Sequence, residues 1–137
     1  MSLYYVDTSA AIKLLAQEAH SGAFAKFYDD QAEGVWVSSA LLRIELVRAV
    51  GRVLPSALPD ARDLLDAFEF VAIDDDIVEA AMGEPDRMLR SLDAIHLATA
   101  MLWRESSSAD LVFATHDTAL GIAARSSGFR VVGLDRT

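Results

Sequence analysis

Short runs of apolar, β-favouring residues recur five times along the chain, and stretches with helical spacing separate them. The runs lie at 3–6, 35–38, 70–73, 111–115 and 130–134. Each run is almost continuously apolar, which is typical of strands buried on both faces of a parallel sheet. Strands that alternate with helices predict an α/β domain with right-handed crossovers. The predicted helices span 8–17, 22–33, 39–54, 60–69, 75–90, 92–105 and 117–126.

The length and composition of the chain indicate one folded domain covering 1–137. A chain of 137 residues can bury a sizeable core, and 53% hydrophobic with 24% charged residues is typical of a globular protein. Pro55 and Pro59 interrupt the helical pattern after the second strand, so we expect a helical hairpin at about 39–69.

Several classes of protein are excluded by what the sequence lacks. The chain has no cysteine, which excludes disulfides, a thiolate nucleophile and cysteine-bound zinc. No apolar run approaches the roughly 20 residues of a membrane span, and the first residues do not resemble a secretory signal. We therefore expect a cytoplasmic protein that does not enter a membrane.

Four acidic residues lie where the predicted fold places ligand sites. Asp7 ends the first strand, Asp117 follows the fourth, Glu45 lies two turns into the helix after the second, and Asp93 begins the helix before the fourth. Ligands of open α/β sheets bind beyond the carboxyl ends of the strands. Each acid also has a simpler interpretation, as a helix cap, a first-turn acid or a surface partner of arginine.

The four acids are harder to explain together than singly. Asp93 interrupts an otherwise apolar helix, and a right-handed α/β fold can bring all four to one end of the sheet. Carboxylates gathered in a cleft repel one another, and burial adds to the cost. A hard divalent cation relieves that repulsion, and Mg²⁺ and Mn²⁺ prefer oxygen ligands.

Four segments, VDTSA, the isolated Glu45, LRSLDAIHLATA and FATHD, together resemble a PIN-domain ribonuclease. More narrowly, the chain resembles the VapC toxins of bacterial toxin–antitoxin pairs over residues 3–134. The resemblance implies a three-layer α/β/α fold whose five-stranded parallel sheet has the order 3-2-1-4-5. It also implies a metal site at Asp7, Glu45, Asp93 and Asp117, supported by Thr8, Ser9 and Thr115.

The function implied by this resemblance is an endoribonuclease that depends on Mg²⁺ or Mn²⁺ and hydrolyses RNA phosphodiesters to 5′-phosphate and 3′-hydroxyl ends. A cognate VapB-type antitoxin would inhibit it by laying its C-terminal segment across the groove and presenting a cation to the acids. A homodimer and a higher toxin–antitoxin assembly are also expected.

The net charge of −9 is unusual for a protein that binds nucleic acid. RNA would therefore have to use local basic residues, for which Lys13, Arg43, Arg48 and Arg90 are the candidates. The alternative for these four is that they are ordinary solvated surface residues.

Two other functions remain open from the sequence. A receiver domain would use Asp74 as phospho-acceptor and Thr115 beside it, although one acid after the first strand and no lysine after the fifth argue against it. An inactive PIN-like module could instead bind RNA or protein. We expect His96 to hydrogen-bond within the core rather than to bind metal, and Asp74 to cap a helix before a solvated turn.

Overall fold

The structure is a computed structural model that describes residues 2–15, 21–107 and 110–134. Its strands are β1 (Leu3–Val6), β2 (Val35–Ser39), β3 (Glu69–Val71), β4 (Leu111–Ala114) and β5 (Arg130–Val132). Its helices are α1 (Thr8–Lys13), α2 (Ser21–Asp30), α3 (Leu41–Val53), α4 (Leu58–Asp66), α5 (Asp75–Met82), α6 (Ser91–Ser107) and α7 (Thr118–Ser126), with a short 3₁₀ turn η1 (Pro55–Ala57).

All five strands are parallel and form one sheet in the order β3-β2-β1-β4-β5. β1 is the central strand, with Leu3 paired with Val35 of β2 on one side and with Leu111 of β4 on the other. This order confirms the fold that the family resemblance implied. It also brings the carboxyl ends of β1 and β4, and with them Asp7 and Thr115, next to each other.

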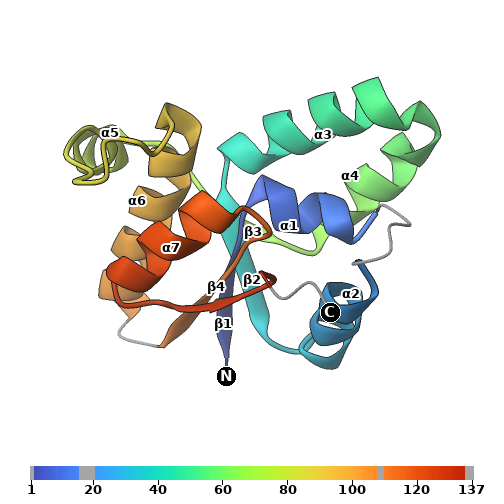
Figure 1. Ribbon diagram of the computed structural model, residues 1–137. Helices are drawn as coiled ribbons and strands as arrows, with labels where there is room; N and C mark the ends of the chain where they lie inside the picture. The colour runs from blue at the N-terminus through green and yellow to red at the C-terminus, as the bar shows by residue number, and fades with distance from the viewer. Residues whose placement is uncertain (1, 16–20, 108–109, 135–137) are drawn as a thin grey trace.

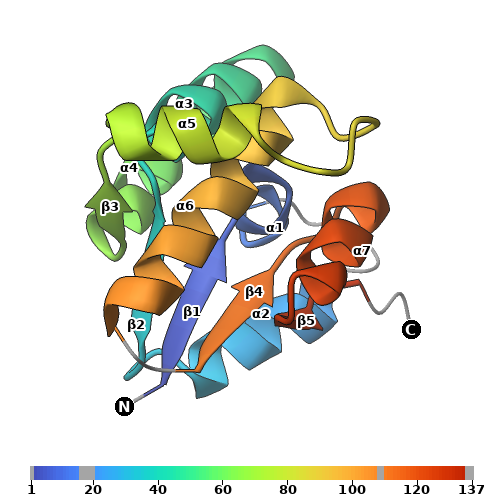
Figure 2. The same ribbon diagram turned by 90° about the vertical axis from the view of Figure 1, so that its left-hand side faces the viewer.

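Helices cover both faces of the sheet, as Figures 1 and 2 show. The side chains of β1 alternate between the faces because a strand has a two-residue period. Tyr4 and Val6 pack with α1, α2, α3 and α4, whereas Tyr5 packs with α6 and α7. α5 packs against α6. Among the described residues, no helix is long and apolar enough to span a membrane. The three-layer prediction is therefore confirmed.

The predicted helical hairpin consists of α3 and α4, joined at Pro55 by η1. The helix predicted for 75–90 was too long, because α5 ends at Met82. Gly83 is its C-terminal cap, and Pro85 cannot continue the helical hydrogen bonds. The prediction for 8–17 was also too long: α1 ends at Lys13, and residues 16 and 17 lie outside the described residues.

Candidate active site

Asp7 is a buried helix cap at the end of the central strand, only 3% exposed. It caps α1 because its Oδ1 accepts a hydrogen bond from the backbone N–H of Ala10 at 2.9 Å. Thr115 Oγ1 donates to Oδ2, and Ser9 Oγ lies 2.9 Å from both oxygens. Burial raises the pKa of Asp7 above its ordinary 3.8, although the nearby His96 and these hydrogen bonds act in the opposite direction. The cap and the site residue are therefore the same side chain.

Thr115 connects Asp7 to Asp117. Its Oγ1, which donates to Asp7, accepts the backbone N–H of Asp117 at 3.1 Å. Asp117 is itself the cap of α7, with Oδ1 accepting from the N–H of Leu120 at 3.1 Å. Asp117 is therefore the cap of α7 rather than a first-turn acid, and the hydroxyl of Thr115 donates to Asp7.

Glu45 is held by two neighbouring helices. Thr8 of α1 donates to its Oε1 at 2.6 Å, and His96 Nε2 of α6 lies 2.8 Å from the same oxygen. Burial acts to raise the pKa of Glu45, but the hydrogen bonds from His96 and Thr8 outweigh it and the pKa is lowered. Glu45 is therefore not a solvated helix acid paired with arginine.

Asp93 lies in the first turn of α6 and is partly buried. Burial raises its pKa above the ordinary 3.8, and the negative charges of Asp117 and Asp7 raise it further. Glu45 adds to this repulsion. The four predicted acids thus share one electrostatic environment beyond the carboxyl ends of β1 and β4.

The donor chemistry of this group suits a hard divalent cation. All four groups are carboxylates, and the mutual repulsion at Asp93 is what a bound cation would relieve. The four carboxylates therefore match the oxygen ligands that such a cation prefers. Among residues 2–15, 21–107 and 110–134, no group of three or more His, Asp or Glu side chains is arranged so that it could hold a metal ion.

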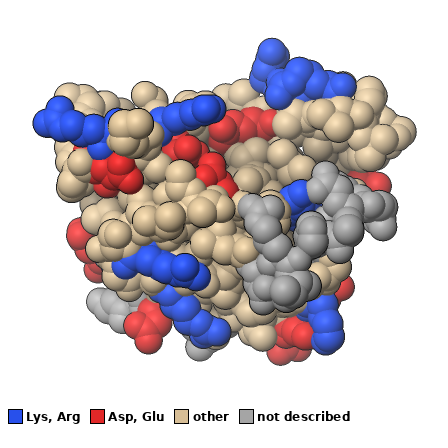
Figure 3. Space-filling model, viewed as in Figure 1, with Lys and Arg blue, Asp and Glu red and all other residues tan. Residues whose placement is uncertain are grey.

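Basic side chains lie on two sides of the acidic side chains at this surface. Figure 3 shows acidic side chains between Lys and Arg side chains over α3 on one side and over the α5–α6 connection on the other. Arg48 and Arg52 are exposed and follow Glu45 by three and seven residues, which places them on its face of α3. Arg43 lies on the opposite face, with its guanidinium 4.9 Å from the centre of the Phe70 ring.

The other predicted basic residues lie at the ends of helices. Arg90 is exposed and directly precedes α6, whose first turn carries Asp93. Lys13 is the last residue of α1 and is partly buried. Arg90 is therefore nearer along the chain to Asp93 than Lys13 is to Asp7.

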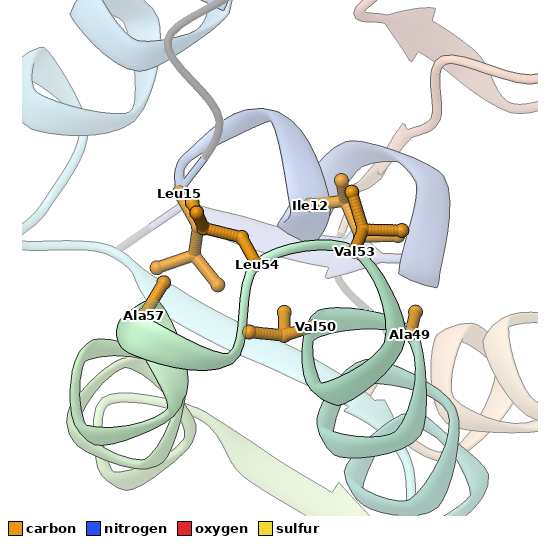
Figure 4. Close-up of a pocket in the computed structure, with 7 residues that line it drawn as sticks. All are labelled: Ile12, Leu15, Ala49, Val50, Val53, Leu54 and Ala57. Carbon is orange, nitrogen blue, oxygen red and sulfur yellow. The ribbon is translucent and has the colours of Figure 1, made fainter.

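An apolar groove lies between α1 and α3. Ile12 follows Thr8 by four residues on α1, and Leu15 lies just beyond the end of that helix. Ala49 and Val53 follow Glu45 by four and eight residues, on the same face of α3. Together with Val50, Leu54 and Ala57 they line a cavity of about 220 Å³ between α1, α3 and η1. Figure 4 shows these side chains facing one another across it.

The receiver-domain alternative fails on the sheet order. Receiver-type domains have the order 2-1-3-4-5, but here β3 is an edge strand, separated from β1 by β2. Asp74, at the end of β3, caps α5 by accepting from the N–H of Ile77 at 3.0 Å. The prediction that Asp74 caps a helix is confirmed. Because β2 separates β3 from β1, Asp74 does not lie beside Asp7 as a receiver domain requires.

Two residues of the site were missed or only half predicted from the sequence. His96 was expected to hydrogen-bond in the core, and it does, but its partner Glu45 is a site acid. Tyr5, which lies 2.7 Å from His96 Nδ1 through its hydroxyl, was treated only as a strand residue. The available signal was a tyrosine in an almost continuously apolar run, because a buried hydroxyl needs a partner.

The chain is similar to several proteins of known family. A family model described as "PIN domain" matches residues 4–125. Ribonuclease VapC35 of Mycobacterium tuberculosis H37Rv is 40% identical over 131 residues, which cover 95% of this chain and 96% of the relative. Ribonuclease VapC46 of the same strain is 34% identical over 133 residues, covering 96% and 98%. A toxin–antitoxin complex from Klebsiella pneumoniae contains a chain of the same fold, with TM-score 0.63, 23% identity and coverage of 85% and 88%.

Proposed function

The chain belongs to the PIN-domain family, and we propose that it is a VapC-type endoribonuclease toxin whose reaction depends on Mg²⁺ or Mn²⁺. The observation that carries the proposal is the shared electrostatic environment of four acids, Asp7, Glu45, Asp93 and Asp117. The 40% identity of the chain to a ribonuclease supports it. An enzyme of this kind would act on RNA in the cytoplasm.

We propose that the four acids hold the ion, directly or through water. A bound divalent ion would lower the pKa of a water molecule and neutralise charge on the phosphate oxygens. The protein's own contribution is orientation. Thr115 and Ser9 fix Asp7 from β4 and α1, and the N–H of Leu120 fixes Asp117.

RNA phosphates would contact the cations beside the acids. Arg48, Arg90 and Lys13 remain the proposed contacts, and Arg52 joins them because it lies on the face of α3 that carries Glu45. Arg43 was also predicted, but its place over Phe70 on the other face makes it the matched control. Arg48→Gln should weaken binding of a cleavable RNA more than Arg43→Gln, with a shallower dependence on salt.

A VapB-type antitoxin is the proposed partner, and the apolar groove between α1 and α3 is its proposed docking site. The groove lies between α1 and α3, the helices that carry Thr8 and Glu45, so we propose that a segment bound in it extends toward the acids. An apolar helix with a cation at that end would both bind and block the site. A homodimer and a larger toxin–antitoxin assembly are proposed as well, and light scattering of the complex tests both.

The decisive test uses the purified protein, free of antitoxin, with total bacterial RNA. We expect discrete cuts with Mg²⁺ or Mn²⁺, none with EDTA and none for Asp93→Asn. Asp63→Asn, which changes an exposed acid on α4, is the matched control and should cut normally. Metal binding without cuts on any RNA would favour the alternative, a PIN-like binding module.

A further inference from the structure

A buried histidine connects the hydrophobic core to one of the site acids. His96 is 2% exposed, and its ring lies between the hydroxyl of Tyr5 and the carboxylate of Glu45. Tyr5 is fully buried, and its oxygen also accepts the backbone N–H of Ser39 at 3.1 Å. An ordered chain of hydrogen bonds therefore runs from the end of β2 through Tyr5 and His96 to Glu45.

The direction of the bond at Glu45 follows from its chemistry. An ionised carboxylate only accepts hydrogen bonds, so Nε2 of His96 must carry the proton that it shares with Glu45. The hydroxyl of Tyr5, 2.7 Å from Nδ1, holds the other edge of the ring. With both edges engaged, the imidazole cannot rotate away from Glu45 without leaving buried polar groups unpaired.

Both hydrogen bonds to Glu45 end on the same oxygen. Thr8 from α1 and His96 from α6 meet at Oε1, so Oε2 is the oxygen that they leave available. The two donors come from different helices, and Glu45 comes from a third, α3. This arrangement fixes where the carboxylate sits and which oxygen it presents.

We propose that His96 is a positioning residue that orients Glu45 so that its Oε2 faces the other acids, with Tyr5 holding the imidazole in place. The inference rests on the proposed function, because it matters only where Glu45 takes part in the site. Asp93 lies three residues before His96 on the same helix, so α6 supplies one acid and orients another. A shift of α6 would disturb both.

The test compares two substitutions of the same histidine. In His96→Gln the side-chain amide can reproduce the donor at Nε2, whereas the shorter side chain of His96→Asn cannot reach Glu45. We expect His96→Asn to lower kcat on a defined RNA by about 10- to 100-fold and to weaken Mn²⁺ binding in calorimetry, with little change in KM. His96→Gln should recover most of the loss, and Tyr5→Phe should fall between the two.

A matched core substitution separates positioning from simple destabilisation. Leu97→Ala removes a fully buried side chain from the same helix without touching Glu45. It should lower the melting temperature at least as much as His96→Asn and leave kcat unchanged below that temperature. A loss of kcat in Leu97→Ala equal to that in His96→Asn would overturn the positioning role.

A measurement on the metal-free protein distinguishes failure of this inference from failure of the proposed function. Nitrogen-15 NMR of the histidine rings should show a hydrogen-bonded Nε2 proton of His96 that shifts in Glu45→Gln. If the wild type cuts RNA and His96→Asn cuts equally well, the inference is wrong and the proposed function stands. If the wild type neither cuts RNA nor binds Mn²⁺, both are wrong, whatever the NMR shows.

Discussion

Replacing Thr115 by valine should destabilise the protein far more than its small change in shape suggests. Valine has the size of threonine, so no cavity forms, but the fully buried Oγ1 is lost. That oxygen donates to Asp7 and accepts the N–H of Asp117. A hydrogen bond to a charged group contributes about 1.5–3 kcal/mol, and an unpaired buried N–H costs about 1 kcal/mol more. The free energy of unfolding should fall by roughly 2.5–4 kcal/mol.

Thermal unfolding with EDTA present measures this loss. For a domain of this size the melting temperature should drop by roughly 5–15 °C. Thr115→Ser is the control, because it keeps the hydroxyl and should lose only about 1 kcal/mol for the missing methyl. The difference between the two variants should also shrink as the pH falls and Asp7 becomes protonated, since a neutral carboxyl needs the donor less. Equal stability of the two variants at neutral pH would refute the reasoning.

Other variants and conditions test separate parts of the account. Asp93→Asn should raise the melting temperature in EDTA at neutral pH while abolishing cleavage, because it removes a partly buried charge and its repulsion with Asp117 and Asp7, the causes that raise the pKa of Asp93. Since the folded pKa values of Asp7 and Asp93 are both raised, the wild type in EDTA should lose stability as the pH rises from about 4 through those values, and added Mg²⁺ should reduce the loss. Gly133→Ala should lower the melting temperature by several degrees: Gly133 has φ of 97°, and an added Cβ would lie 2.5 Å from the backbone oxygen of Thr115. Val53→Asp should weaken antitoxin binding at least tenfold in calorimetry without changing cleavage, whereas Val78→Asp, on α5, should leave binding unchanged.

The fold was largely predictable because its signals are local. Each strand of the parallel sheet is a short apolar run, and Pro55 and Pro59 mark the hairpin. The strand order came from the family resemblance, since no local pattern encodes which strands pair. The predicted helix at 75–90 was too long because the apolar residues keep a helical spacing beyond Gly83. The helix itself ends at Met82, with Gly83 as its C-terminal cap.

The sequence predicted that the four acids lie near one another, but not the hydrogen bonds that orient them. Asp7 and Asp117 follow strands, so the sheet topology predicts that they meet. The hydrogen bonds that orient them join residues far apart in sequence, such as Thr115 with Asp7 and His96 with Glu45. A single sequence gives the residue types of such pairs but not which ones come into contact.

The chemistry of the cleaved ends tests the central claim most directly. An RNA cut by this protein with Mg²⁺ or Mn²⁺ should carry 5′-phosphate and 3′-hydroxyl ends, because in the proposed reaction a divalent ion held by the four carboxylates would supply an activated water molecule as the nucleophile. Ends with a 2′,3′-cyclic phosphate, formed equally well in EDTA, would mean that the ribose hydroxyl is the nucleophile. That result would contradict the assignment of Asp7, Glu45, Asp93 and Asp117 as a catalytic metal site.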